Sequence, residues 1–280
     1  MPLPVPARDL LSVCIIIILG VGLALAGGAG GILRADVPVF LWCAAVAFGL
    51  NWLAFVPSAL ARTEHYYDLT GGVTYLSLTG LAVVMSQPLD LRSALVAAMV
   101  CAWAVRLAGF LFVRVKRAGK DIRFDRVKAN PSTFLVWWTL QALWVLTTMA
   151  AALVIVTGGE RVPMGWLGWI GVGVWLFGFV VEVVADAQKS AFRRDPANCG
   201  GFIQTGLWSW SRHPNYFGEI VLWSGVALIA IPVLQSRLNE NGINAAHMEL
   251  LPQQPITADH QPIFIRLESR AMGHVPDQAR

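Results

Sequence analysis

Charged residues are scarce in this chain of 280 residues: Lys, Arg, Asp and Glu together make up 14%, against about 25% in an average soluble protein. Hydrophobic residues make up 56%, and the mean hydropathy is +0.59. The net charge of +4 lies between hydrophobic runs rather than on a soluble surface, which argues against nucleic-acid binding. We therefore expect the lipid bilayer to be the solvent, where a spanning helix needs about 20 apolar residues.

Several motifs for ligand binding are also missing. No Gly-x-Gly-x-x-Gly segment follows a strand and no Walker loop occurs, so neither of these nucleotide-binding loops is expected. The cysteines lack metal-binding or redox spacing, and no His/Cys cluster predicts a metal site. We interpret the four cysteines as small apolar residues, and they are Cys14, Cys43, Cys101 and Cys199.

Seven long apolar runs dominate the sequence instead. Windows of this length and hydropathy predict transmembrane helices, so the predicted fold class is all-α, a polytopic bundle of about seven spans. The sixth run is rich in glycine, which is typical of helices that pack closely in membranes. The runs are 10–33, 37–60, 71–87, 91–112, 132–157, 163–185 and 216–234.

Basic residues alternate between the loops that connect these runs. The fourth and sixth loops carry clusters of Lys and Arg and the second carries Arg62 and His65, whereas the others carry one basic residue each, Arg34, Arg92 and Arg161. The positive-inside rule therefore places the N-terminus and the even loops in the cytoplasm. The last stretch, 237–280, is polar and contains four prolines. We predict a helical domain over 1–236 and a poorly ordered tail after it.

One candidate site lies where the sixth run ends. If this helix continues into the cytoplasm, Glu182, Asp186, Lys189 and Arg193 share one of its faces. Lys189 and Arg193, one turn apart, would suit one phosphate group. The alternative interpretation is a solvated helix end with ordinary pairs between residues four apart.

A second candidate site is the start of the seventh run. Pro214 fits the first turn of a helix but not its middle, so we expect a helix to begin near His213 or Pro214, beside Arg212. The free amide groups and positive dipole of such a helix start favour an anion. Asn215 and Glu219 lie on one face of the first turns. A carboxylate at membrane depth needs a partner, which is either a ligand or Arg212.

A third cluster follows the second run and combines a carboxylate, an imidazole and two phenols. Its residues are Glu64, His65, Tyr66 and Tyr67. Such a group can polarise a carbonyl or deliver a proton. The alternative is an interfacial aromatic belt with a turn.

Three of these segments resemble one protein family. They are Tyr-Asp-Leu-Thr-Gly-Gly-Val-Thr-Tyr at 67–75, Ala-Asp-Ala-Gln-Lys-Ser-Ala-Phe at 185–192 and Gly-Leu-Trp-Ser-Trp-Ser-Arg-His-Pro-Asn-Tyr-Phe-Gly-Glu at 206–219. Together they look like the bacterial DUF1295 proteins, a group that is similar to the C-terminal domain of the steroid 5α-reductases and to the sterol reductases. The resemblance covers about residues 40–235.

This resemblance implies a helical bundle in the bacterial inner (plasma) membrane that reduces a conjugated C=C bond in a lipophilic, steroid- or isoprenoid-like substrate. NADPH would enter from the cytoplasm and the substrate from the bilayer. The implied partners are this small molecule and membrane lipid, with neither metal nor nucleic acid. Glu64 and Tyr67 would act as catalytic residues beside the substrate carbonyl. The implied cofactor-binding residues are Asp186, Lys189, Arg193, Arg212, His213, Asn215, Tyr216 and Glu219.

Two alternatives stay open. Isoprenylcysteine carboxyl methyltransferases carry a similar Arg-His-Pro-x-Tyr element, so residues 212–216 also fit a methyltransferase that uses S-adenosylmethionine. Members of the DUF1295 group usually continue with another hydrophobic span and a basic, aromatic segment that helps to close the cofactor site. This chain has the polar stretch Leu238–Arg280 there. The second alternative is therefore a non-catalytic membrane protein with an incomplete cofactor site.

Overall fold

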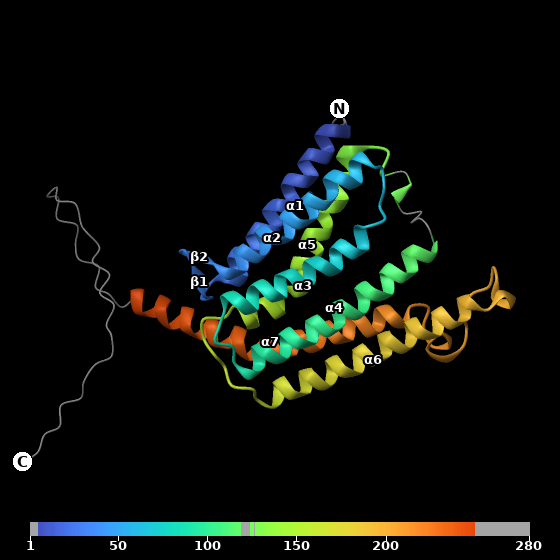
Figure 1. The fold of residues 1–280 in the computed structure, drawn as a ribbon. Coiled ribbons are helices and arrows are strands. Elements are labelled where there is room, and N and C mark those ends of the chain that lie inside the picture. Colours follow the sequence, from blue (N-terminus) through green and yellow to red (C-terminus); the bar gives the residue numbers. More distant parts are fainter. Residues whose placement is uncertain (1–4, 119–123, 126, 250–280) are drawn as a thin grey trace, which may run out of the picture. The chain divides into compact units, whose positions relative to one another are not determined.

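Seven long α-helices form the fold in the computed structural model, which describes residues 5–118, 124–125 and 127–249. All seven are long and apolar enough to cross a membrane, which confirms the predicted all-α polytopic class. Two short strands, β1 (Leu33–Arg34) and β2 (Val37–Pro38), pair antiparallel after the first helix. The helices are α1 (Val5–Gly28), α2 (Val39–Leu60), α3 (Tyr67–Met85), α4 (Leu91–Ala118), α5 (Pro131–Val156), α6 (Trp166–Arg194) and α7 (Pro214–Glu249) (Figure 1).

Local sequence signals set several helix boundaries. α5 begins with Pro131 after Asn130, whose side chain accepts a hydrogen bond from the backbone N–H of Ser132, as an N-cap residue does. α7 begins at Pro214, and α6 continues to Arg194. The start of α7 was predicted from the sequence, and the continuation of α6 past residue 185 is the condition on which the first candidate site depends.

α3 begins at Tyr67, earlier than the predicted run 71–87. Gly71 and Gly72 therefore lie inside the helix. A Cβ atom at Gly72 would lie 2.5 Å from the Cβ atom of Ala108 in α4. The glycines allow α3 and α4 to approach closely, so they mark a contact between helices rather than a helix start.

α7 continues to Glu249, beyond residue 236, where the helical domain was predicted to end. Nothing in 233–249 forbids a helix, since the next prolines are Pro252 and Pro255. The compact helical unit itself ends at Glu240. The rest of the predicted tail, 250–280, lies outside the described residues.

α5 is the central helix of the bundle. It packs against α1, α2, α3 and α4, and its membrane-crossing segment is the most buried of the seven. The core around it includes Phe40 of α2, Leu78 of α3 and Trp103 of α4, packed with Leu146 and Met149 of α5. This core fixes the relative positions of α3, α4 and α5.

α6 and α7 pack backbone against backbone through glycines. A Cβ atom at Gly178 would lie 2.4 Å from the backbone nitrogen of Leu222. A Cβ atom at Gly218 would lie 2.6 Å from the backbone nitrogen of Glu182. The glycine-rich sixth run thus forms the close helix contact that its composition predicts.

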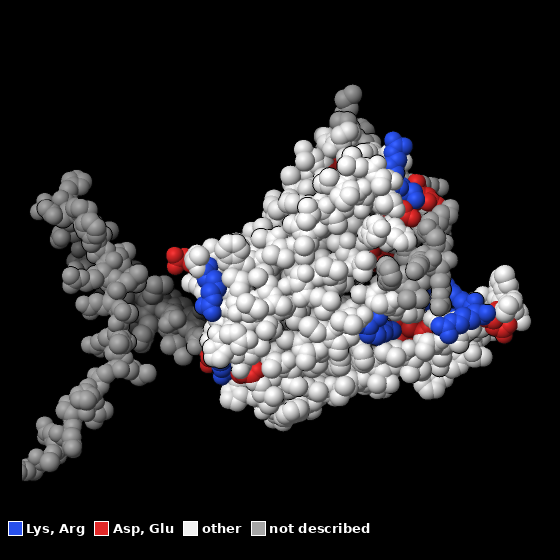
Figure 2. Space-filling model, in the orientation of Figure 1, with Lys and Arg blue, Asp and Glu red and all other residues white. Residues whose placement is uncertain are grey.

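Charged side chains gather at the two ends of the helices. We call one of them the basic end: it holds the starts of α1, α3, α5 and α7 and the ends of α2, α4 and α6 (Figure 1). On the face drawn in Figure 2, a band of uncharged side chains separates the charged groups at the two ends. This distribution suits a chain that crosses the bilayer several times.

Arginines at the opposite end bind backbone carbonyl groups. Arg92 Nε donates to the carbonyl oxygen of Val162 at 3.2 Å. Arg161 donates to that of Ser86 at 2.7 Å, and Arg237 donates to that of Gly27 at 2.9 Å. These three side chains tie together segments that are far apart in the sequence.

Candidate functional site

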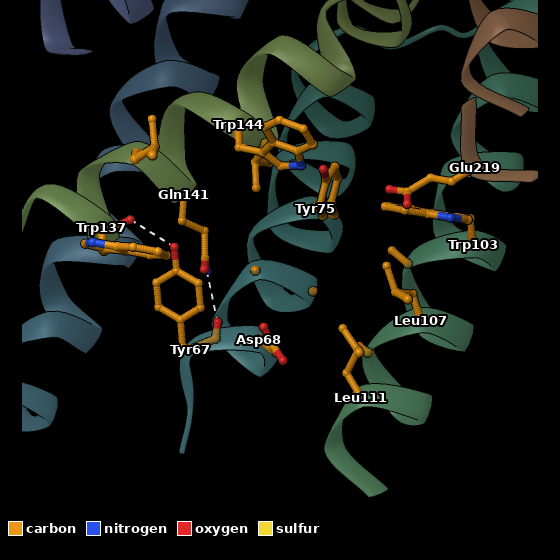
Figure 3. Close-up of a pocket in the computed structure, with 16 residues that line it drawn as sticks. Tyr67, Asp68, Tyr75, Trp103, Leu107, Leu111, Trp137, Gln141, Trp144 and Glu219 are labelled. Atoms are coloured by element: carbon orange, nitrogen blue, oxygen red, sulfur yellow. Dashed lines mark hydrogen bonds between the residues drawn. The ribbon is translucent and has the colours of Figure 1, made fainter. Parts of the chain in front are cut away.

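A cavity of about 400 Å³ lies between α3, α4 and α5, with one residue from α7 in its wall (Figure 3). The lining is mostly apolar and aromatic, as in many small-molecule sites. It consists of Tyr67, Asp68, Gly71, Gly72, Tyr75, Trp103, Ala104, Leu107, Ala108, Leu111, Trp137, Leu140, Gln141, Trp144, Val145 and Glu219.

The cavity runs parallel to the helices. Its lining extends over the same number of residues on α3 (67–75), α4 (103–111) and α5 (137–145). This stretch corresponds to about 12 Å of helix. α3 and α5 start at the basic end, and α4 finishes there. Tyr67, Leu111 and Trp137 therefore lie nearer to the basic end than Tyr75, Trp103 and Val145 do, and we call the region of the latter three the deep end.

An aromatic cluster forms the deep end of the cavity. The ring centroid of Trp103 lies 4.9 Å from that of Tyr75 and 5.0 Å from that of Trp223. Figure 3 shows the Glu219 carboxyl beside Trp103, facing Tyr75. Among the described residues, Glu219 has neither a hydrogen bond nor an ion pair. The carboxyl of Glu219 is therefore available to a molecule in the cavity.

Arg106 of α4 forms the centre of a charged cluster beside this deep end. Its guanidinium group bonds the carboxylates of Glu182 and Asp186 on α6. The indole N–H of Trp103 donates to Glu182 Oε2 at 3.1 Å. Trp103 thus joins the wall of the cavity to the cluster. Glu219 lies within electrostatic range of the same three charged residues.

Arg106 was not predicted from the sequence as a site residue. A signal was present, because an arginine inside the apolar run 91–112 needs a partner at membrane depth. Glu182 and Asp186, one turn apart on α6, are those partners. Asp186 therefore belongs to an ion pair with α4, and its predicted role as a cofactor-binding residue stays a prediction.

The other predicted residues of α6 lie further toward the basic end. Lys189 Nζ lies 4.6 Å from the ring centroid of Trp208, in a cation–π contact. Arg193, one turn further, is exposed. The structure therefore leaves the side chain of Arg193 accessible to an anion, and it holds Lys189 against Trp208.

The start of α7 brings the remaining predicted cofactor residues together. Arg212 and His213 are exposed, and the His213 ring stacks on Tyr216 with centroids 5.3 Å apart. Asn215 Oδ1 is buried without a hydrogen-bond partner in the described part of the chain. Glu219, one turn beyond Asn215, lies in the cavity wall, and it forms no ion pair with Arg212.

The two predicted catalytic residues have different surroundings. Tyr67 lines the cavity, and its hydroxyl donates to the backbone carbonyl of Trp137 at 2.9 Å. Glu64 does not line it, and its carboxylate accepts a hydrogen bond from Lys128 at 2.9 Å. This hydrogen bond is the main reason that the pKa of Lys128 is raised above its usual value. The structure brings Tyr67 to the site but not Glu64.

The seven apolar helices of the described residues define a multi-pass membrane protein, and an apolar cavity lies between three of them. Residues 54–251 match the family described as protein of unknown function, DUF1295. The match covers most of the chain, which therefore belongs to this family.

Two curated relatives match a shorter part of the sequence. An uncharacterized protein of Schizosaccharomyces pombe is 31% identical over 105 residues, which is 31% of this chain and 30% of the relative. A probable O-methyltransferase, UstE, of Ustilaginoidea virens is 33% identical over 90 residues, or 32% of this chain and 31% of the relative. The chain thus spans about a third of the length of the curated relatives it matches. No solved structure matches.

Proposed function

We propose that the chain is a membrane-bound, NADPH-dependent reductase of a conjugated C=C bond in a lipophilic substrate. The observation that carries the proposal is the position of Glu219. This carboxyl faces an apolar cavity without a partner among the described residues, and it lies on the first turns of the helix that follows the exposed Arg212 and His213. An apolar ligand site and a basic surface therefore adjoin the start of one helix.

The cavity suits the lipophilic substrate. Its volume of about 400 Å³ falls within the range of about 300–1,000 Å³ that is usual for small-molecule sites. Leu107, Leu111 and Trp144 supply apolar walls, and Trp144 and Leu140 are also exposed at the surface of the bundle. A molecule that dissolves in the bilayer would bury its apolar body here.

The basic end suits the phosphates of NADPH. Arg193 and Arg212 are exposed cations, and the start of α7 adds free amide groups and a positive dipole. The buried oxygen of Asn215, which has no partner in the described part of the chain, would accept a hydrogen bond from an amide group. These residues would hold the cofactor, and the reduced nicotinamide would supply a hydride.

Tyr75 and Glu219 are the groups that would handle the proton. Both line the deep end of the cavity. The Tyr75 hydroxyl also interacts with the Thr148 side chain, and the Tyr67 hydroxyl donates to the backbone carbonyl of Trp137. Either group would hydrogen-bond the carbonyl that is conjugated with the C=C bond. In the balanced reaction the β-carbon gains the hydride, the α-carbon gains a proton from the protein, and the π bond is lost as NADPH becomes NADP⁺.

A binding measurement tests this proposal through Arg193. Purified chain in lipid nanodiscs should gain thermal stability with NADPH, because a ligand that binds only the folded state raises its apparent stability. Arg193→Ala should lose most of this shift while it keeps the melting temperature of the unliganded protein. Arg62→Ala, an exposed arginine in the α2–α3 link, is the matched control. Equal NADPH affinity in both variants would remove Arg193 from the site.

A second candidate function is methyl transfer from S-adenosylmethionine. It is supported by the similarity to a protein named as a probable O-methyltransferase and by the Arg-His-Pro-x-Tyr element at 212–216. S-Adenosylmethionine carries no phosphate, so its binding should depend little on Arg193. Stabilisation by S-adenosylmethionine alone would favour the methyltransferase, and a response to neither ligand would favour a non-catalytic protein.

The proposed location is the bacterial inner membrane with the basic end in the cytoplasm. The alternation of basic loops supports this orientation. Both curated relatives are fungal, so the bacterial location stays a prediction. Labelling of a single cysteine placed at Ala197, between α6 and α7, from either side of sealed vesicles would test the orientation.

A further inference from the structure

We propose that the segment joining α6 to α7 lies on the surface of the bilayer, with Trp210 inserted in the headgroup region of the leaflet at the basic end. This inference is independent of the proposed reductase activity. It rests on two contacts that hold the segment at the depth of the hydrocarbon boundary. It also rests on the exposed aromatic and basic side chains of the segment at that depth.

The length of α6 places its end outside the hydrocarbon. The helix has 29 residues and is about 43 Å long, whereas about 20 residues cross the hydrocarbon core. Apart from Glu182, which pairs with Arg106, its residues from Trp166 to Ala185 are uncharged, and charged residues become frequent from Asp186 onward. The boundary of the hydrocarbon therefore lies near Ala185. The last turns, up to Arg194, extend about 13 Å beyond it.

Two contacts bring the following segment back to this boundary. The 3₁₀-helix η3 (Gly206–Ser209) packs on α6, and the indole N–H of Trp208 donates to the backbone carbonyl of Ala185 at 3.0 Å. Further along, Gly218 packs against the backbone of Glu182, which sets the start of α7 at the same depth. Trp210 lies between these two points, so its backbone is held near the boundary.

The side chains of the segment match a membrane surface. Trp208 is 9% exposed, because it packs on α6, whereas Trp210 is 87% exposed. Tryptophan favours the boundary between hydrocarbon and water, where its ring is in contact with lipid and its N–H with polar groups. Arg212, two residues after Trp210, is exposed and complements anionic headgroups. The segment therefore lies on the surface of the bilayer that surrounds the seven helices.

The experiment places an environment-sensitive fluorophore on single cysteines in a variant without the four native cysteines. One label replaces Trp210, and a second, Ser211→Cys, keeps Trp210 in place. The control is Ala197→Cys in η2 (Pro196–Asn198), which follows the far end of α6 directly. The labelled chains are placed in phosphatidylcholine nanodiscs. Quenching is compared between lipids spin-labelled near the headgroup and iodide in the aqueous phase.

We expect lipid-borne quenchers to act several-fold more strongly at 210 and 211 than at 197, and iodide to show the reverse order. An equal response to both quenchers at all three positions would overturn the proposal. The proposal would also fail if 210 and 211 were quenched by iodide as strongly as 197.

Discussion

The contact between α6 and α7 gives a sharp prediction for Gly178→Ala. The new Cβ atom would lie 2.4 Å from the backbone nitrogen of Leu222 and 2.6 Å from the carbonyl oxygen of Gly218. Both neighbours are backbone atoms, so no side chain can move aside. Ordinary contacts between heavy atoms need about 3.5 Å, so the two helices must separate by roughly 1 Å.

The expected cost follows from two opposing effects. Overpacking of this kind costs about 1–3 kcal/mol. Alanine is favoured over glycine in a helix by about 1 kcal/mol, which offsets part of the loss. Gly178→Ala should therefore lower the free energy of unfolding by up to about 2 kcal/mol. It should also weaken ligand binding, because Gly218 is adjacent to Glu219 and the carboxyl would move within the cavity.

Gly173→Ala on the same helix is the matched control. A Cβ atom there has nothing within 4 Å, so this variant should be as stable as the parent chain or slightly more stable. Reversible unfolding in mixed detergent and lipid micelles measures both variants against the parent. If Gly178→Ala proves as stable as Gly173→Ala, the close packing of α6 on α7 is refuted.

Two further predictions concern side chains in the cavity wall and in the charged cluster beside it. Arg106→Ala leaves the carboxylates of Glu182 and Asp186 without their cation. Breaking such a buried pair should lower the free energy of unfolding by about 3–5 kcal/mol in the same unfolding assay. A loss under about 1 kcal/mol would contradict the buried cluster. Tyr75→Phe should reduce the rate of enone reduction by about 10²–10⁴-fold if its hydroxyl is the proton donor, with unchanged NADPH binding. Tyr67→Phe should instead cost about 1 kcal/mol of stability and leave the rate within a few-fold, and the reverse pattern would restore Tyr67 as the donor.

The sequence predicted the helices well because hydropathy and helix-start signals are local properties. All seven runs correspond to helices, and Pro214 begins α7. The errors also have local causes. Gly71 and Gly72 suggested a late start for α3 because glycine disfavours helices, whereas here the pair serves the contact with α4.

The cavity could not be predicted in the same way. It forms where residues 67–75, 103–111 and 137–145 converge. The pattern of apolar residues along one helix does not tell which other helices pack against it. Glu219 was singled out because a carboxylate in an apolar run needs a partner. Tyr75 was missed because a tyrosine in an apolar run is equally compatible with the core. Glu64 was selected for its chemistry, and its ion pair with Lys128 depends on a residue far away in the sequence.

The most direct test of the proposed function is a comparison of NADPH and S-adenosylmethionine binding to the full chain in lipid nanodiscs, followed by thermal unfolding. We predict that NADPH alone raises the melting temperature, since ligand bound only to the folded state stabilises it, and that Arg193→Ala lowers this response. A rise with S-adenosylmethionine alone, or with neither ligand, would contradict the reductase.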